Sequence, residues 1–392
     1  MQTTGRPASP APSGSAHLLR TINERAALYH LLENDTLTRV ELRKLTGLAK
    51  PTASQVMLRL LESGLAVTAG RATAKQVGPK AEVYTVNADY AFAAAATLRE
   101  PDGLTVAVSD LKGRERVSAS TEVDFGAVAV DRAVLDLLSE TASEAGIDLD
   151  RIGAFHLAVP GAHDPHTDTI SYADIPGLPE ARLRTALAEG LDASIQIHND
   201  VNAATVAERR DPDAAGGLAV LWLGGEGIGV GIDLGQGLLT GEHGAAGELG
   251  YVPAFADRSG PDDPTFQHWI GAPALIELGR THGVEGATAA AVMAAAVEDG
   301  TRPFLEEYAA RVASAVRLLG CLIDPPRIVL AGEVASAGGE ALAEHVRTAS
   351  GRFGERVVPS AVEGDPVAIG TLDSAYADLK ARLLDTSPAD GQ

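Results

Sequence analysis

The sequence has almost no cysteine: Cys321 is the only one in 392 residues. A single cysteine excludes an internal disulfide framework and a zinc site built from several thiolates. Because Cys321 stands in the apolar run 318–323, we expect it to be a small buried core residue and not a nucleophile.

Long hydrophobic runs are also missing. No stretch of about eighteen consecutive apolar residues occurs, so we expect no membrane-spanning helix. Residues 1–17 are rich in proline, serine and glycine and lack the apolar core of a signal peptide, so we expect a disordered tail there. These absences favour a cytoplasmic protein that has no membrane partner.

Positive charge is scarce and unevenly distributed. The chain has 32 Lys and Arg residues against 53 Asp and Glu residues, a formal net charge of −21. Residues 1–87 nevertheless hold 11 basic against 6 acidic residues, which leaves 21 against 47 for the remainder. A basic head on an acidic body is expected if only the head meets a polyanion such as DNA. The acidic body argues against nonspecific binding to nucleic acid or anionic membranes.

A helix–turn–helix pattern lies in this basic part. Thr38 and Glu41 form a T-x-x-E capping box, which satisfies free amides at the start of a short helix. Gly47 suits the tight turn that follows, because the turn needs a relaxed backbone. Pro51 fits the first turn of a second helix, where its missing N–H matters little.

The surrounding segments extend the pattern to a winged helix-turn-helix over residues 18–87. A helix over about 16–33 precedes the pair, and a strand, a polar loop and the strand 82–86 follow as the wing. The apolar positions of the second helix have the spacing i, i+3, i+4, i+7 and i+8, which predicts one buried stripe. The residues expected to face the core are Leu18, Ile22, Leu28, Leu31, Leu32, Val40, Leu42, Leu45, Ala53, Val56, Met57, Leu60 and Leu61.

The other face of the second helix carries polar side chains that suit a DNA interface. Thr52, Gln55 and Arg59 can hydrogen-bond to base edges, and basic residues near the helix start and in the wing can hold phosphates. Helical hairpins with polar surfaces also occur in proteins that bind no DNA, so that alternative stays open. The predicted DNA-binding residues are Lys50, Thr52, Ser54, Gln55, Arg59, Arg71, Lys75 and Lys80.

From Ala88 onward, strand-like and helix-like segments alternate, which predicts an α/β body. Buried strands are expected at 153–159 and 218–223, and the latter runs into a glycine-rich loop at 224–231. The strand from Ile195 ends in the polar pair Asn199-Asp200, which precedes a helix.

The order and spacing of motifs in the body resemble the ROK family of sugar kinases and repressors. The resemblance implies a two-lobed actin-like (ribonuclease H-like) α/β fold, with a first lobe over 88–208 plus 366–385 and a second over 209–365. The motifs are Pro160-Gly161, Asn199-Asp200-x-Asn202-Ala203, Gly225-x-Gly227-Ile228-Gly229, Gly241-x-x-Gly244-x-Ala246-Gly247-Glu248-Leu249-Gly250 and Ala331-Gly332.

The resemblance also implies a sugar site. Asn199 and Asp200 match the Asn-Asp pair at the sugar of the family's kinases, in which the aspartate is the general base. Asn-Asp after a strand can equally be a simple helix cap. We expect Asn199, Asp200, Glu248, Tyr251 and Gln267 to contact a sugar, and we assign no catalytic residue.

The phosphate-binding motifs of the family's kinases are not retained. The segment 93–103 lacks the aspartate and paired glycines of the family's first phosphate loop. In the second loop, Glu226 stands where the family has a hydroxyl donor. Two like unit charges about 4 Å apart repel by about 4 kcal/mol at a surface-like dielectric, so this carboxylate opposes nucleotide phosphates.

The family's zinc module is missing too. Tyr251 replaces its histidine, Thr265 replaces its last cysteine and Gln267 replaces its final glutamate. We therefore expect no metal and no cofactor.

The sequence therefore predicts a DNA-binding transcriptional regulator that is not an enzyme, namely a repressor of carbohydrate-related genes. The expected partners are a double-stranded DNA operator, a sugar or sugar-phosphate effector, and a second copy or more in a homodimer or homotetramer. Two alternatives stay open. One is an ATP-dependent sugar kinase with an appended helical domain, and the other is a ligand-independent regulator that uses its body only for assembly.

Overall fold

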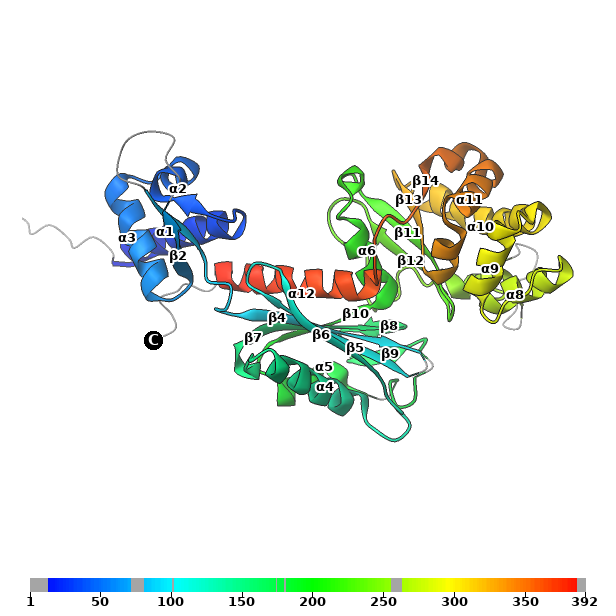
Figure 1. Ribbon diagram of the computed structural model, residues 1–392, viewed down its shortest axis with the longest axis horizontal. Coiled ribbons are helices and arrows are strands. Elements are labelled where there is room, and N and C mark those ends of the chain that lie inside the picture. The colour runs from blue at the N-terminus through cyan, green and yellow to red at the C-terminus, as the bar shows by residue number, and fades with distance from the viewer. Residues whose placement is uncertain are drawn as a thin grey trace, which may run out of the picture.

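The computed structural model describes residues 13–71, 81–100, 102–173, 175–179, 181–254 and 263–385. Three parts follow one another along the chain, and a last helix runs between them (Figure 1). We name them the head (elements within 13–86), the first lobe (92–208) and the second lobe (218–359). None of the helices in the described ranges has the length and apolar character needed to span a bilayer.

The head consists of three helices and a small antiparallel sheet in the order β1-β3-β2. The predicted capping box is confirmed, because Glu41 N donates to the Thr38 hydroxyl and Thr38 N donates to the Glu41 carboxylate. Gly47 ends α2 at φ 70°, the left-handed conformation that favours glycine. The elements of the head are α1 (Ser13–Leu32), β1 (Leu37–Thr38), α2 (Arg39–Thr46), α3 (Lys50–Glu62), β2 (Ala66–Arg71) and β3 (Glu82–Val86).

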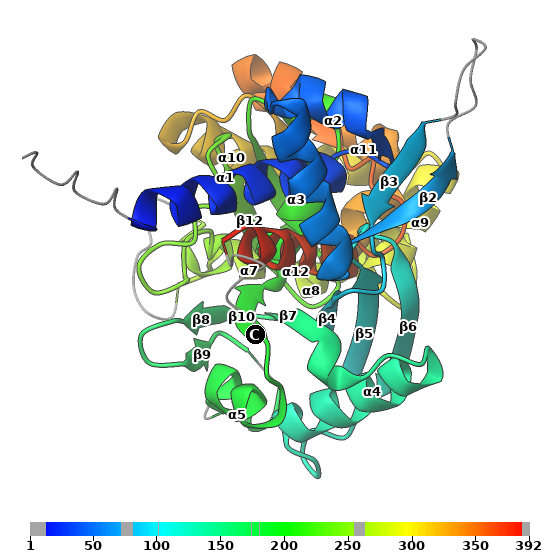
Figure 2. The same cartoon turned by 90° about the vertical axis from the view of Figure 1, so that its left-hand side faces the viewer.

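The predicted core of the head is right for α3 and partly wrong for α1 and α2. Leu18 and Ile22 are 59% and 50% exposed, because the N-terminal part of α1 extends past the other two helices (Figure 2). Val40 and Leu45 of α2 are also largely exposed, since this eight-residue helix buries only Leu42. The predicted core residues that are buried are Leu28, Leu31, Leu42, Ala53, Val56, Met57 and Leu60.

The first lobe is built on a five-stranded sheet in the order β10-β7-β4-β5-β6. Strands β4, β5 and β6 are antiparallel, whereas β7 and β10 continue the sheet in parallel with β4. Helices α4 and α5 cover one face of the sheet, and the last helix, α12 (Pro366–Asp385), covers the other (Figure 1). The remaining elements are β4 (Phe92–Arg99), β5 (Gly103–Asp110), β6 (Glu115–Glu122), α4 (Val130–Glu144), β7 (Ile152–Val159), β8 (Ala162–Asp164), β9 (Thr169–Ser171), α5 (Leu183–Gly190), β10 (Ser194–Asn199) and α6 (Asp200–Glu208).

Small residues let α12 lie close to its neighbours. Ala93 of β4 shares a hydrophobic cluster with Leu379 of α12 and with core residues of the head. A Cβ atom added at Gly153 would lie 2.7 Å from the Leu379 side chain, and one at Gly370 would lie 1.7 Å from the Ala203 carbonyl of α6. Helix α12 is therefore packed tightly against both the first sheet and α6.

The second lobe has a four-stranded sheet in the order β12-β11-β13-β14. Helix α6 also contacts this sheet, because Gly231 of β12 leaves room for Thr205 of α6. Helices α6 and α12 thus lie between the two lobes. The elements of the second lobe are β11 (Leu218–Leu223), β12 (Ile228–Asp233), α7 (Phe266–Ile270), α8 (Ala272–Thr281), α9 (Ala289–Glu298), α10 (Arg302–Leu322), β13 (Ile328–Ala331), α11 (Glu333–Ser350) and β14 (Val357–Pro359).

The prediction that Cys321 is buried is wrong. Cys321 lies at the end of α10 and is exposed, and its neighbour Leu322 is 76% exposed. The apolar run does not continue a buried stripe there, because the last turn of α10 buries Leu319 and Gly320 on its inner face and leaves Cys321 outside.

Candidate functional site

A pocket of about 850 Å³ lies between the two lobes. Its wall is built from the end of β4, the β10–α6 junction, the glycine loop before β12, and the segments around Glu248 and Gln267. All five predicted sugar-site residues line it, although they are spread over nearly seventy positions of sequence. They are Asn199, Asp200, Glu248, Tyr251 and Gln267.

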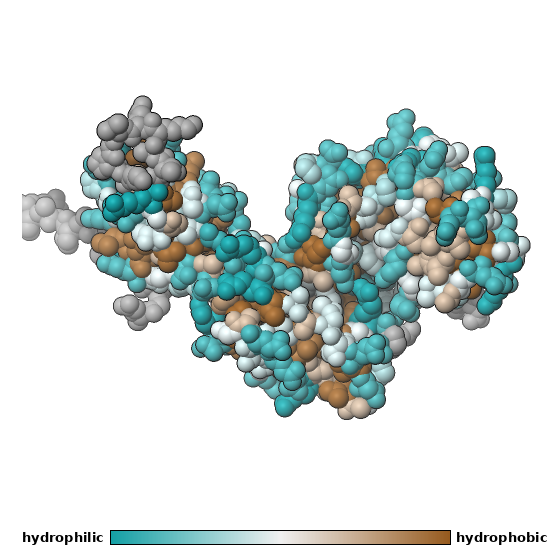
Figure 3. Space-filling view, viewed as in Figure 1, coloured by the Kyte–Doolittle hydropathy of each residue, from teal (hydrophilic) through white to brown (hydrophobic). Residues whose placement is uncertain are grey.

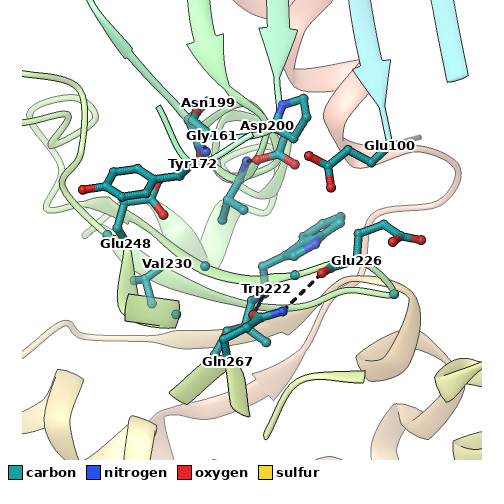
Figure 4. A pocket seen from close by; sticks show the side chains of 18 of the residues that line it. Glu100, Gly161, Tyr172, Asn199, Asp200, Trp222, Glu226, Val230, Glu248 and Gln267 are labelled. Carbon is teal, nitrogen blue, oxygen red and sulfur yellow. Dashed lines mark hydrogen bonds between the residues drawn. The ribbon is translucent and has the colours of Figure 1, made fainter. Parts of the chain in front are cut away.

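Asn199 and Asp200 stand where β10 becomes α6. The Asn199 side chain accepts a hydrogen bond from Asn202 N at 3.0 Å and donates to the Gly161 carbonyl at 3.1 Å. Asn199 is therefore the N-cap of α6 as well as part of the pocket wall. The cap fixes the backbone that presents Asp200 to the pocket (Figure 4).

Asp200 is the most perturbed carboxyl in the pocket. Its Oδ1 accepts a hydrogen bond from Val201 N at 2.8 Å. The pKa of Asp200 is raised to about 7, mainly by burial, and the neighbouring Glu248 and Glu100 carboxylates contribute to the rise against the opposing effect of the Val201 amide. A carboxyl that titrates near neutrality can hold or release a proton at a sugar hydroxyl.

Glu248 and Tyr251 face the pocket from the second lobe. Burial raises the pKa of the Glu248 carboxyl above its ordinary value. The Tyr251 ring packs on the Tyr172 ring of the first lobe, with centroids 4.4 Å apart and an interplanar angle of 41°. This pair joins the two lobes at the pocket and provides an aromatic surface against which a sugar ring can pack.

Gln267 lines the pocket but is occupied by the glycine loop. Its amide oxygen accepts a hydrogen bond from Ile228 N at 3.0 Å, and its amide nitrogen donates to the Glu226 carbonyl at 3.2 Å (Figure 4). Both polar atoms therefore hold the loop in place. One N–H and one lone pair of the Gln267 carboxamide are not used by these two hydrogen bonds, so the side chain can position the loop and still contact a ligand.

The glycine loop carries carboxylates on both sides. Gly225 N donates to the Glu333 carboxylate at 3.2 Å, and Glu226 also lines the pocket. Arg99 of the first lobe pairs with Asp365 at 3.0 Å and lies 3.9 Å from Glu333, so it crosses from one lobe to the other. The segment that matches the family's first phosphate loop is instead the end of the β4–β5 hairpin.

Sequence reasoning did not name several residues of the pocket, and four of them matter for its chemistry. Trp222 is the last residue but one of β11, close to the glycine loop, a position that pointed to the pocket and was not used. Arg99 ends β4 and Glu100 follows it, at the sheet edge where Asn199 also stands, which is a second usable signal. Tyr172 follows the short β8–β9 hairpin at φ 65°, and nothing in the local sequence indicates its role.

The predicted DNA-binding residues that the structure describes lie in α3 and at the end of β2. Lys50, Gln55 and Arg71 are exposed, and Thr52 and Ser54 are half-buried. Lys75 and Lys80 lie outside the described residues.

Arg59 departs from the expectation. Its guanidinium pairs with the carboxylate of Glu24 on α1, which is 1% exposed. The side chain therefore joins α3 to α1 and does not lie free on the polar face. The spacing of Arg59 from Gln55, i to i+4, favoured a base contact for Arg59. The position of its guanidinium is instead set by the buried carboxylate of Glu24, which lies 35 residues earlier in the chain.

Two curated proteins illustrate what the chain is similar to. The bifunctional enzyme NanE/NanK of Brucella suis biovar 1 is 31% identical over 200 residues, which are 50% of this chain and 38% of that protein. The xylose repressor of Caldicellulosiruptor bescii is 24% identical over 242 residues, which are 61% of this chain and 60% of that protein. The chain thus spans less than two thirds of the length of either relative.

Solved structures agree in fold. A ROK family transcriptional regulator, described as a homolog of the E. coli MLC protein, superposes with a TM-score of 0.71 at 17% identity, covering 95% of this chain and 100% of that one. A ROK hexokinase from Thermus thermophilus gives a TM-score of 0.62 at 22% identity, covering 74% of this chain and 99% of that one. At these identities the likeness shows the fold, an α/β fold of the sugar-kinase type.

The similar proteins include both regulators and sugar kinases, so similarity alone does not choose between the two activities. The family model described as the ROK family matches residues 103–371, which is more than half of the chain. This chain belongs to the ROK family.

Proposed function

We propose that the chain is a DNA-binding transcriptional regulator, a repressor of carbohydrate-related genes, which a sugar or sugar-derived ligand controls from the pocket. The observation that carries the proposal is the head, in which a capped helix, a glycine turn and a helix with an exposed polar face form a helix–turn–helix unit. The similarity to the regulator structure extends over 95% of the chain, against 74% for the hexokinase. The difference is about the size of the head, which supports a regulatory role.

The polar face of α3 is the proposed recognition surface of a winged helix. Thr52 and Gln55 have the donors and acceptors that read base edges in a major groove, and Ser54 lies beside them. Lys50 at the start of α3 and Arg71 at the end of β2 are placed to hold phosphates, together with Lys75 and Lys80 of the expected wing. Arg59 is left out of this set because its charge is used inside the head.

Helix α12 is the proposed link between the pocket and the head. At its N-terminal end, Asp365 caps the helix by accepting from Val367 N at 2.9 Å, and the same carboxylate pairs with Arg99 at the pocket. Near its C-terminal end, Lys380 pairs with Glu33 of the head at 2.6 Å. An open gap separates the head from the second lobe on the face that Figure 3 shows.

A second polar path reaches α12 from the sugar-site strand. His198, next to Asn199, contacts His156 at 2.9 Å, and His156 contacts Asp378 of α12 at 3.3 Å. Burial, with the neighbouring His156, lowers the pKa of His198 to about 3, so this imidazole is neutral. A ligand that moves the β10–α6 junction would therefore move groups that are bonded to α12.

Control by a ligand makes a quantitative demand. If the ligand weakens operator binding by some factor, the operator must weaken ligand binding by the same factor.

We also propose that the protein acts as a homodimer or homotetramer. Two helix–turn–helix heads then bind half-sites one helical turn of DNA, about 34 Å, apart.

The test is a fluorescence anisotropy titration of the full chain against DNA fragments tiled upstream of its own gene. We expect one fragment to bind at least about 1,000-fold more tightly than random DNA at physiological salt. Gln55→Ala should weaken binding to that fragment by about 1–3 kcal/mol and leave random DNA unchanged, and Lys50→Ala should weaken both and reduce the salt dependence. Arg132→Ala, which removes an exposed cation from the first lobe, is the control. If every fragment binds like random DNA, the proposal fails.

A sugar kinase is the second candidate, and Asp200 is the observation that favours it. Its raised pKa suits a general base, and it lines the pocket. Against it stand Glu226 and Glu333, whose carboxylates lie at the glycine loop. A coupled assay of ADP release over a panel of sugars distinguishes the two functions. Turnover that Asp200→Asn abolishes would establish a kinase and would contradict the proposal that this pocket is an effector site.

A ligand-independent regulator, with a body used only for assembly, is the remaining alternative. A sugar present at 100 times its dissociation constant should stabilise the fold by about 2.7 kcal/mol. Thermal unfolding that no sugar shifts would favour this alternative, while leaving the DNA-binding proposal intact.

A further inference from the structure

The described lining of the pocket is strongly acidic. Arg99 provides its one guanidinium, and six residues bear carboxyl groups. These are Glu100, Asp200, Glu226, Glu248, Asp263 and Glu333.

The one guanidinium is already committed to carboxylates. Arg99 pairs with Asp365 at 3.0 Å and approaches Glu333 to 3.9 Å. The imidazole of His268 also lines the pocket, and its Nδ1 lies 3.0 Å from the Thr265 hydroxyl, with which it caps α7. Within the described lining, a negatively charged ligand would therefore find no cation that is not already bonded to the chain.

Two carboxyl groups of the pocket lack the partners that buried carboxylates ordinarily have. In the described part of the chain, the Asp200 carboxylate receives hydrogen bonds from backbone amides only, and Glu248 has no hydrogen-bond or ion-pair partner. Figure 4 shows the Asp200 and Glu100 carboxylates pointing towards each other across the pocket. Carboxylates that face one another in a confined space are stabilised by a cation placed between them.

Aromatic rings provide a second, independent observation. Trp222 lies between Asp200 and Gln267, and Tyr172 lies on the side of Glu248 (Figure 4). Tyr251, whose ring packs on the Tyr172 ring, lines the same pocket. The faces of indole and phenol rings carry negative potential and attract cations within about 6 Å of the ring centre. The same faces pack against the C–H groups of a sugar ring. The aromatic rings and the carboxylates together therefore favour a sugar that carries a positive charge.

We propose that the ligand of this pocket is an unphosphorylated sugar that carries a protonated amine, with the ammonium group held by Asp200, Glu248 and Glu100. The proposal rests on the proposed function only in taking this pocket as the effector site. It narrows the effector, because the acidic lining repels sugar phosphates and other anionic sugars. Neutral sugars can pack against the same aromatic rings, but they form no ion pairs with the carboxylates.

The test compares sugars that differ at one position. Isothermal titration calorimetry of the full chain at pH 7 measures dissociation constants for glucosamine and glucose, for galactosamine and galactose, and for mannosamine and mannose. N-acetylglucosamine and glucosamine 6-phosphate are included as the neutralised amine and the anionic sugar. In the pair that binds most tightly, we expect the amine to bind at least about tenfold more tightly than its neutral partner, a difference of about 1.4 kcal/mol. We expect glucosamine 6-phosphate to bind at least about tenfold more weakly than glucosamine.

Two substitutions assign the effect to the pocket. Glu248→Gln keeps the shape and removes a charge, so the preference for the amine should fall about tenfold. Glu277→Gln removes an exposed carboxylate of α8 that is not part of the described pocket lining, and it should change the preference by less than about twofold. Thermal unfolding of both variants checks that they are folded.

Each outcome has a clear consequence. A neutral sugar that binds as tightly as its amine, or a phosphorylated sugar that binds more tightly, overturns the inference. Binding of no sugar at all overturns it too, but leaves operator binding to be judged by its own titration. An amine preference in a protein that binds no specific DNA would support the inference and defeat the proposed function.

Discussion

Replacing Arg59 by methionine separates a structural from a DNA-reading role for this residue. The substitution leaves the Glu24 carboxylate unpaired at 1% exposure. Removal of one partner of a buried pair typically destabilises by about 3–5 kcal/mol. Because the Arg59 side chain is 33% exposed and water screens part of its charge, we expect about 2–3 kcal/mol for the head.

Hydrogen exchange of the α1 and α3 amides is the appropriate assay. The two tryptophans, Trp222 and Trp269, lie in the second lobe, so their fluorescence does not report on the head. Local opening that is easier by 2–3 kcal/mol should speed exchange in these helices roughly 30- to 150-fold.

A double substitution tests the cause. Arg59→Met combined with Glu24→Gln removes both charges and should restore most of the protection, because no buried charge is then left unpaired. Gln55→Met, on the same helix, should leave exchange unchanged. Unchanged protection in Arg59→Met, together with loss of specific DNA binding, would refute this reasoning and return Arg59 to the recognition surface.

Three further predictions follow from single contacts. Thr38→Ala removes the capping box of α2 and should destabilise the head by about 1 kcal/mol, measurable as faster exchange of the α2 amides. Leu379→Ala opens a cavity where α12 meets the head and the first sheet, and should lower the free energy of unfolding by about 2–4 kcal/mol in denaturant titrations. Asp200→Asn should stabilise the body above pH 7, by at most about 4 kcal/mol, and should bring no gain below about pH 4. The sign follows because the folded chain holds the Asp200 proton up to about pH 7 while the unfolded chain loses it near pH 3.8; equal effects at pH 5 and pH 8 on tryptophan-monitored unfolding would contradict it.

The elements that the sequence predicted correctly are those set by local chemistry. The capping box at Thr38, the turn at Gly47 and the buried stripe of α3 depend on residues within one or two helical turns of each other. The five residues of the predicted sugar site were chosen from the family resemblance, and all five line one pocket of the structure. Whether they bind a sugar stays a prediction.

The predictions failed where contacts between residues far apart in the sequence determine the burial or the partner of a side chain. Leu18 and Ile22 have helical spacing, but no described element covers that part of α1, so periodicity alone could not reveal their exposure. The ion pair of Arg59 was not predicted, because its partner, Glu24, lies on another helix. Tyr172 enters the pocket only because the two lobes meet there, and no local pattern encodes that meeting.

The carboxylates of the pocket also support the proposed role of this kinase-like fold as a sensor. A phosphate at the glycine loop would have to displace Glu333 from Gly225 N and from Arg99, and would then lie beside Glu226. Each unit of like charge at about 4 Å opposes it by about 4 kcal/mol at a surface-like dielectric. A sugar without negative charge displaces neither Glu333 nor Arg99. None of the binding energy of such a sugar is then used to position a nucleotide. If the sugar binds more tightly when α12 is in one of two positions, it shifts the populations towards that position. The difference in binding free energy between the two positions is the upper limit of that shift.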